Sequence, residues 1–176
     1  NVTINGNIMT NNWADAQAGF AVLFTVRGEN GLCPWCTLQN ITYTNNTVSN
    51  SAGGFQLLGK DYLGASTQAS GLVISNNQMF LAGGLGTNGR GMQVQQYNGL
   101  VVSNNEFIIL NSFMNLAAPN SGAITYINNV ANSGDYGLFG DGVGSGTVAL
   151  TTYAPGSTFT GNVVYGPSIP VALYPT

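Results

Sequence analysis

The stretch Val2-Thr3-Ile4-Asn5-Gly6-Asn7 is the first of six copies of one short phrase. The later copies begin at residues 41, 72, 100, 124 and 157, and each is a run rich in β-forming residues that ends on an asparagine. Successive final asparagines are 39, 31, 28, 24 and 33 residues apart, which is the length of one repeat unit in a solenoid protein. These final residues are Asn7, Asn46, Asn77, Asn105, Asn129 and Asn162.

Apolar residues alternate with polar or small ones inside the copies, as Ile41 and Tyr43 or Leu72 and Ile74 show. A period of two with one apolar face predicts a half-buried strand. A second strand follows each final asparagine directly, and a third comes at a variable distance. Three short strands in each of about six repeats predict an all-β fold, a parallel β-helix. A two-layer sandwich also has short alternating strands, but it would not place the same asparagine in every repeat. The expected third strands are 20–22, 55–57, 92–94, 114–116, 136–138 and 171–173.

The repeated asparagine predicts a ladder at one corner of the coil. Asparagine tolerates the left-handed backbone conformation, so it suits a turn between strands. Stacked side-chain amides can bond to each other or to the backbone of the next coil, which avoids a cost of about 1–3 kcal/mol for each unpaired buried group. The alternative interpretation is an asparagine-lined ligand track, but recurrence in every coil favours an architectural role.

Composition limits the function. The 176 residues predict a single domain, residues 1–176. Three basic residues, six acidic residues and no histidine make only 5% of the chain charged, against about 25% in a typical protein. Nucleic-acid binding is disfavoured because only Arg27, Lys60 and Arg90 carry positive side chains. No apolar run is long enough to predict a membrane span.

The ends of the chain carry a separate expectation. The sequence opens without methionine inside a strand-like repeat, and neither end shows an amphipathic helix or a charged cap. We therefore expect a piece of a longer secreted protein. The alternative is that open coil ends stack on other copies or on neighbouring domains.

Cys33-Pro34-Trp35-Cys36 is the most distinctive local sequence. A thioredoxin-like site needs a helix after the first cysteine, and a zinc site needs two further ligands from a chain without other cysteine or histidine. A local disulfide or two free thiols remain, and we favour a Cys33–Cys36 disulfide that fixes a loop. No metal site is predicted. No cofactor is predicted either, since the glycine-rich stretch 83–91 is a poor match to a phosphate-binding loop.

Basic, acidic and aromatic residues of several loops form a candidate glycan patch. Aligning the repeats places Thr25, Lys60 and Tyr97 at one height, with Arg27 beside Tyr62 one coil away. The competing interpretation is a solvated loop pair worth under about 1 kcal/mol. The candidate residues are Trp13, Arg27, Trp35, Lys60, Asp61, Tyr62, Arg90 and Tyr97.

The repeated pattern Ile/Val-x-Ile-x-Asn-Asn resembles that of the right-handed parallel β-helix superfamily, the pectate-lyase-like proteins. A narrower likeness covers residues 2–62. The residues there look like those of a group of secreted bacterial β-helix repeat proteins of unassigned activity. They are Asn11-Asn12-Trp13, the run 19–27, Cys33-Pro34-Trp35-Cys36, Thr44-Asn45-Asn46 and the run 57–62. The resemblance implies a right-handed coil and an extracellular location, and it carries over no catalytic residue.

Enzymes of the wider superfamily act on acidic or neutral polysaccharides. Lyases need calcium-binding carboxylates with a basic residue, and hydrolases need paired carboxylates. The six acidic residues here are scattered, and no two are expected at equivalent positions of adjacent coils: Asp15, Glu29, Asp61, Glu106, Asp135 and Asp141.

The sequence therefore favours a non-catalytic extracellular structural or adhesive solenoid, which assembles end to end or with neighbouring domains. The alternative is a module that binds or degrades polysaccharide. A minor alternative is ice binding along an outward, threonine-rich column in which valines interrupt the array: Thr3, Thr42, Val73, Val101, Thr125 and Thr158.

Overall fold

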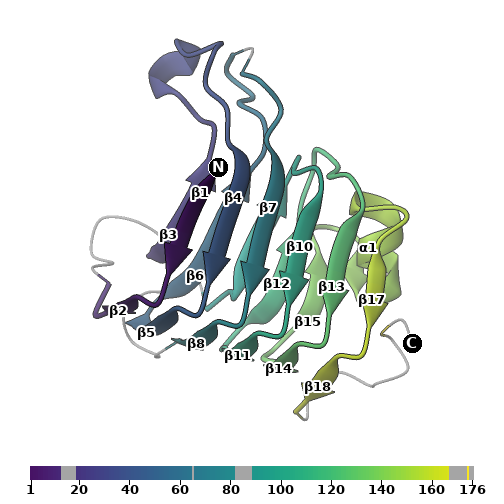
Figure 1. Cartoon of the computed structure of the whole chain (residues 1–176). Coiled ribbons are helices and arrows are strands. Elements are labelled where there is room, and N and C mark those ends of the chain that lie inside the picture. The colour runs from purple at the N-terminus through teal and green to yellow at the C-terminus, as the bar shows by residue number, and fades with distance from the viewer. Residues whose placement is uncertain (13–18, 65, 82–88, 167–173, 175–176) are drawn as a thin grey trace.

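The computed structural model describes residues 1–12, 19–64, 66–81, 89–166 and 174. Short strands follow one another along three sheets, so the chain winds as a parallel β-helix of six coils (Figure 1). This confirms the predicted fold class. The first sheet contains β1 (Val2–Asn5), β4 (Gln39–Thr44), β7 (Ser70–Ser75), β10 (Leu100–Ser103), β13 (Ile124–Ile127) and β17 (Thr158–Thr160).

The second and third sheets repeat this order. The second sheet contains β2 (Ile8–Thr10), β5 (Thr47–Ser51), β8 (Gln78–Leu81), β11 (Glu106–Ile108), β14 (Val130–Asn132) and β18 (Val163–Tyr165). The third contains β3 (Phe20–Thr25), β6 (Gly53–Leu58), β9 (Met92–Gln95), β12 (Ser112–Leu116), β15 (Gly137–Gly140) and the antiparallel β16 (Gly144–Ser145).

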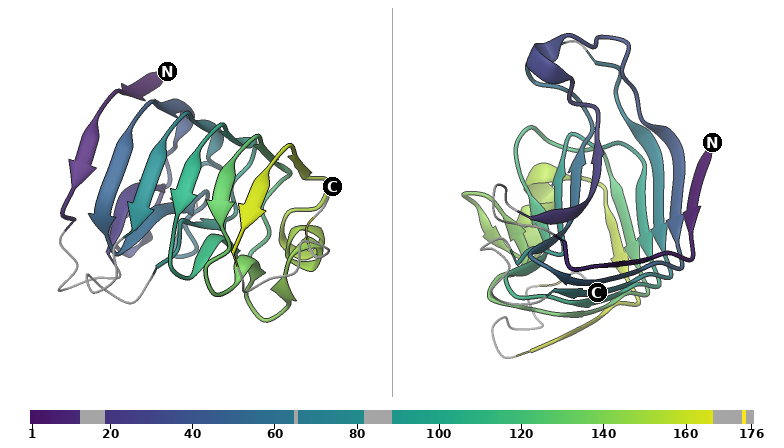
Figure 2. Two further views of the ribbon diagram at one scale, coloured as in Figure 1. Left: turned by 90° about the horizontal axis from the view of Figure 1, so that it is seen from below. Right: turned by 90° about the vertical axis from the view of Figure 1, so that its left-hand side faces the viewer.

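The coil is right-handed. Seen from its first coil, the chain turns clockwise as successive coils recede from the viewer (Figure 2, right). Neighbouring strands of the first sheet are parallel and in register, with Ile41 beside Leu72 and Tyr43 beside Ile74. Alternate side chains of each strand therefore point to one interior, and the apolar residues of all three sheets form a single buried core.

Aromatic rings fill the core at two levels. In the first coils, the ring of Tyr43 makes edge contacts with Phe24 and Phe55, at centroid distances of 5.9 and 5.3 Å. In the later coils, the rings of Tyr126 and Phe159 stack at 5.1 Å. These contacts bury large apolar area between adjacent coils, which adds to the stability given by the backbone ladders.

The asparagine ladder is present, but the turn beside it is made by a different residue than expected. The final asparagines do not have the left-handed conformation. The residue before each one does, with φ between 54° and 70°: Gly6, Asn45, Asn76, Asn104, Asn128 and Gly161. The preceding residue therefore turns the corner, and the ladder asparagine is left free to point its amide inward.

Each inward amide links two coils. The Oδ1 atom of Asn77 accepts hydrogen bonds from the backbone N–H and from Nδ2 of Asn46, at 2.9 and 3.2 Å. The same pair of bonds joins every successive ladder asparagine from Asn7 to Asn162. The buried polar groups are thus paired within the ladder, which accounts for their position beside an apolar core.

The register of the third sheet corrects two sequence expectations. Leu138 pairs with Met114, where the repeat alignment placed Tyr136. Phe55 pairs with Val22, and Leu57 pairs with Phe24, whereas the repeat alignment placed Phe20 beside Phe55. The strand β3 is longer than expected, and a slip of two residues keeps the same side chains inward, so alternation alone does not reveal it. The expected last strand, 171–173, lies outside the described residues.

A short helix lies beside the last coils, where the sequence predicted none. The helix α1 (Thr147–Tyr153) packs against β15 through its buried residues Ala149 and Leu150. Its four β-branched residues weaken the helical signal in the sequence. Among the described residues, no helix has the length and apolar character needed to cross a membrane.

Candidate ligand-binding groove

The outer face of the third sheet carries an open groove over the first three coils. Its volume is about 440 Å³. Strand register builds the floor, because Leu23 lies beside Gln56 in one row and Thr25, Leu58 and Gln95 form the next row. Two loop residues complete the wall. The lining residues are Leu23, Thr25, Arg27, Gln56, Leu58, Tyr62 and Gln95.

The floor combines amides with an apolar surface. The Leu23 side chain is 53% exposed, although it lies in the middle of a strand. Gln93 and Gln95 are connected, with Nε2 of Gln93 3.5 Å from Oε1 of Gln95, and Arg90 donates to Oε1 of Gln93 at 2.8 Å. Such a surface can hold the hydroxyl edge of a ligand by hydrogen bonds and its apolar face by contact.

Arg27 and Tyr62 form the wall together. The guanidinium carbon of Arg27 lies 4.8 Å from the centre of the Tyr62 ring, which is a cation–π contact. The ring of Tyr62 is 62% exposed and borders the groove. The expected proximity of these two residues is confirmed. Among the described residues of the lining, Arg27 is the charged one and none is a carboxylate.

Asp61 lies behind this wall and binds two backbone amides. Its Oδ1 accepts from the N–H of Leu63 and its Oδ2 accepts from the N–H of Gly28, both at 2.9 Å. These two hydrogen bonds, with a smaller contribution from the charge of Arg27, lower the pKa of Asp61 below its ordinary value. Asp61 is 5% exposed, so it is a structural link and not a contact surface for ligand.

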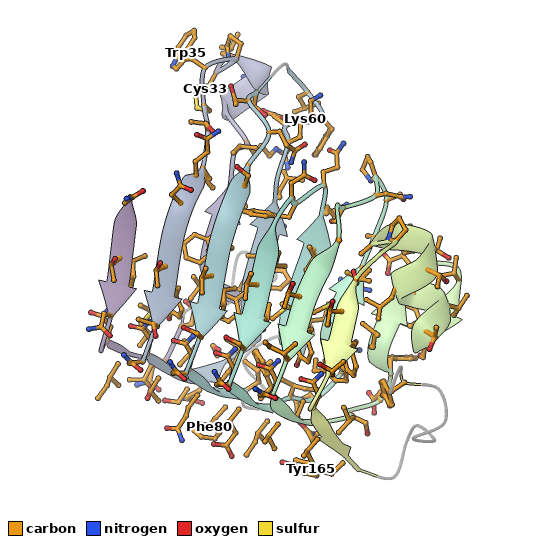
Figure 3. All side chains as sticks on the ribbon, turned by 45° about the vertical axis from the view of Figure 1, so that its right-hand side comes forward. Cys33, Trp35, Lys60, Phe80 and Tyr165 are labelled. Carbon is orange, nitrogen blue, oxygen red and sulfur yellow. A yellow bond between two sulfur atoms is a disulfide. The ribbon has the colours of Figure 1, made fainter. Side chains whose placement is uncertain are left out.

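The loop after β3 projects beyond the sheets (Figure 3). It contains the short helical turn η1 (Glu29–Gly31) and a disulfide between Cys33 and Cys36. Trp35, between the cysteines, is 76% exposed and points away from the sheets (Figure 3). Trp35 is therefore not part of the groove lining, although it belongs to the same loop as Arg27.

This projecting loop is packed against the loop that carries Tyr62. The two backbones touch, because a Cβ atom added at Gly31 would lie 2.3 Å from the carbonyl oxygen of Leu63. A Cβ at Gly64 would lie 2.4 Å from the carbonyl oxygen of Gly31. Only glycine permits this approach at both positions. The backbone N–H of Thr67 also donates to the carbonyl of Cys36 at 3.0 Å.

Other members of the candidate glycan patch lie elsewhere. Tyr97 is buried in the core, and burial raises its pKa to about 12. The strand register aligns Thr25 with Leu58 and Gln95, so Lys60 and Tyr97 do not share its height. Lys60 is exposed on the loop after β6. Trp13 lies outside the described residues.

The floor of the groove was not predicted from the sequence. Only Gln56 falls within an expected third strand, and Leu23, Leu58 and Gln95 fall just beyond the expected ranges, yet these outward side chains make most of the lining. A signal was available, since glutamine recurs at the middle position of two successive third strands, at Gln56 and Gln93.

Two further outer surfaces differ in character. A shallow polar groove of about 610 Å³ follows the ladder corner, lined by asparagines together with Gln78, Glu106 and Val130. The second sheet presents apolar side chains outward, including Phe80 and Tyr165 (Figure 3). The outer column of the first sheet contains threonine at its ends and Val73 and Val101 at its centre, in register as expected.

The carboxylates with described side chains do not gather at one site. Asp61 is bound by backbone amides, Glu106 accepts from Gln78 at 3.2 Å, Asp141 accepts from Asn115 at 2.8 Å, and Asp135 is exposed. Within the described ranges, no three potential metal-ligating side chains lie together.

Comparison with known proteins gives no identity. No family model, no curated protein and no solved structure matches the chain.

Proposed function

We propose that the chain is a non-catalytic, extracellular adhesive β-solenoid that binds a polysaccharide along the groove of the third sheet. The observation that carries this proposal is the lining of that groove, with an exposed Tyr62 ring and Arg27 at one end and Gln56 and Gln95 on the floor. A sugar chain offers apolar ring faces and hydroxyl edges, which match an aromatic wall and amides on two adjacent rows of the floor.

The form of the groove also suits a chain-like ligand. It is open and runs across parallel strands of successive coils, so a linear ligand can extend along the coil axis. Leu23 and Leu58 supply an apolar floor between the amides. The resemblance of the repeat to pectate-lyase-like proteins supports a polysaccharide as the ligand class and an extracellular location.

The position of the carboxylates supports binding without cleavage. Polysaccharide hydrolysis uses two carboxyl groups on either side of the scissile bond. The one described carboxylate near the groove, Asp61, is held by the N–H groups of Gly28 and Leu63. Its lowered pKa keeps it ionised at neutral pH, which does not suit a general acid.

The test is a panel of soluble polysaccharides, including polygalacturonate and xylan, in affinity electrophoresis and in product analysis. We expect at least one polysaccharide to retard the protein, with no shortening of that polysaccharide. The Tyr62→Ala variant should lose the retardation. Tyr165→Ala is the matched control, because Tyr165 is an exposed tyrosine of the second sheet. Cleavage of any polysaccharide, or no retardation by the whole panel, would overturn the proposal.

A second role follows from the first coil. Val2 is 54% exposed although Ile41 and Leu72, its register partners on the next coils, are buried, and β1 and β2 are the outermost strands of their sheets. A strand edge of this kind can pair with another strand through its backbone. We propose that a further coil, from another copy or a neighbouring domain, continues the sheets here. Electron microscopy of the purified protein tests this, since single short rods at high concentration would exclude self-assembly.

A further inference from the structure

We infer that Asp61 is the positioning residue of the groove, which holds Arg27 and Tyr62 together as one wall and thereby sets the affinity for ligand. This inference rests on the proposed polysaccharide-binding function. It explains how the long side chains of Arg27 and Tyr62 are kept in place at the groove. It concerns a residue that does not itself line the groove.

The chain places the wall residues directly beside the two amides that Asp61 binds. Gly28 follows Arg27, and Leu63 follows Tyr62. One carboxylate therefore ties both wall segments, since Oδ2 binds the Gly28 N–H and Oδ1 binds the Leu63 N–H. The backbone segment of Arg27 is thus fixed to the backbone segment of Tyr62, although the two segments belong to different coils.

Asp61 is itself held from a third direction. Its backbone N–H donates to Oγ of Ser66 at 2.8 Å, and the residue is almost fully buried. The close approach of Gly31 and Gly64 presses the same two loops together. Asp61 has little freedom to move, so its carboxylate holds the Gly28 and Leu63 amides at a fixed separation.

A charged carboxylate is required for this arrangement. Both of its partners are N–H donors, and an amide in its place has only one acceptor oxygen. In an Asp61→Asn variant, the Nδ2 group would face either Gly28 or Leu63, and one of these two N–H groups would lose its partner. Hydrogen bonds to charged groups are also stronger than those to neutral groups.

Protonation of Asp61 would have the same effect as this substitution. The pKa of Asp61 is lowered first by the Leu63 and Gly28 hydrogen bonds, while burial opposes the shift and the charge of Arg27 adds to it. Arg27 is the charged group that acts on this carboxylate. The link is therefore complete above the ordinary aspartate pKa and is lost as the pH falls through the lowered value.

The experiment compares wild-type, Asp61→Asn and Asp135→Asn proteins in titrations with polygalacturonate and with xylan, from neutral pH down to strongly acidic pH. Asp135→Asn removes the same charge from an exposed position. At neutral pH we expect Asp61→Asn to bind roughly tenfold more weakly or worse, and Asp135→Asn to bind as wild type does. With xylan, a ligand without the uronate carboxyl groups of polygalacturonate, wild-type affinity should fall in acid, whereas the weak affinity of Asp61→Asn should not change over the same range. Equal affinity of wild type and Asp61→Asn would overturn the inference.

Amide hydrogen exchange gives a readout that needs no ligand. In the folded wild-type protein, we expect the amides of Gly28 and Leu63 to be protected, and in Asp61→Asn at least one should exchange rapidly while the core strands stay protected. If no polysaccharide binds wild type, the proposed function fails, and exchange alone decides the role of Asp61. Unchanged protection of both amides would then overturn it.

Discussion

Asn77 and Asn105 occupy the same position on successive coils, and Oδ1 of Asn105 accepts from both the backbone N–H and Nδ2 of Asn77 at 2.9 Å. Asn105 passes the pattern on, because its own Nδ2 donates to Oδ1 of Asn129 and to the carbonyl of Ile74. Asn105 therefore accepts hydrogen bonds from the preceding coil and donates to both neighbouring coils.

The first prediction concerns the ladder. Asn105→Ala leaves the two N–H groups of Asn77 without their acceptor in a buried position, so the free energy of unfolding should fall by about 3 kcal/mol or more. Chemical denaturation measures this change. The control is Asn104→Gly at the preceding corner residue, whose φ is 56°. Glycine accepts that conformation, so the cost should be below about 1 kcal/mol. A larger loss for Asn104→Gly than for Asn105→Ala would contradict the ladder role.

The second prediction concerns the disulfide. Cys33 and Cys36 are three residues apart and belong to a loop outside the coil. Closing so small a ring restricts the unfolded chain only slightly, so replacing both cysteines with serine should lower the free energy of unfolding by less than about 2 kcal/mol. The melting temperature should fall by a few degrees, with the cooperative transition retained. Loss of that transition would show that the disulfide supports the whole fold.

The third prediction concerns alkaline pH. Burial raises the pKa of Tyr97 to about 12, from an ordinary value of 10.0. Between these values the unfolded chain releases the phenolic proton while the folded chain keeps it, so stability falls as the pH rises above about 10. The Tyr97→Phe variant should show a weaker decline in denaturation measurements across this range. At neutral pH its stability should stay within about 1 kcal/mol of wild type, because the Tyr97 hydroxyl has no hydrogen-bond partner among the described residues. An equally steep decline in both proteins would contradict the burial of this group.

The fourth prediction tests the floor of the groove. Gln56→Ala removes an amide that lines the groove on β6 without changing the inward side of the strand. We expect weaker polysaccharide binding with a melting temperature close to that of wild type, since the side chain points outward. Gln78→Ala is the matched control on the second sheet, where the exposed Gln78 lies outside the groove lining. Equal binding losses in the two variants would show that the ligand does not lie along the third sheet.

The sequence predicts most of this fold because every coil must pair the same buried polar groups at one corner. A buried amide must be satisfied at the same corner every time, so Asn46, Asn77, Asn105 and Asn129 recur and identify the coil directly. Strand parity follows from the alternation beside them. Which two residues pair across the third sheet does not follow, because a slip of two preserves parity, and Val22 therefore pairs with Phe55 where Phe20 was expected.

The groove was harder to predict for a related reason. Its floor depends on the register of the third sheet, and its wall depends on loops of unequal length that meet in space. The alignment that placed Arg27 beside Tyr62 is the one that the strand register shifts by two residues, and the two side chains nevertheless meet in a cation–π contact between loops. The role of Asp61 could not be anticipated, because its partners are backbone N–H groups, and these give no signal in the sequence.

The most direct test is to map the ligand on the folded protein by amide chemical-shift changes during titration with oligogalacturonate and xylo-oligosaccharide. We expect the shifts to concentrate on β3, β6 and β9, at Leu23, Gln56 and Gln95, and on the loop residues Arg27 and Tyr62. Shifts confined to the threonine column of the first sheet, or no shifts with either ligand, would contradict polysaccharide binding in this groove.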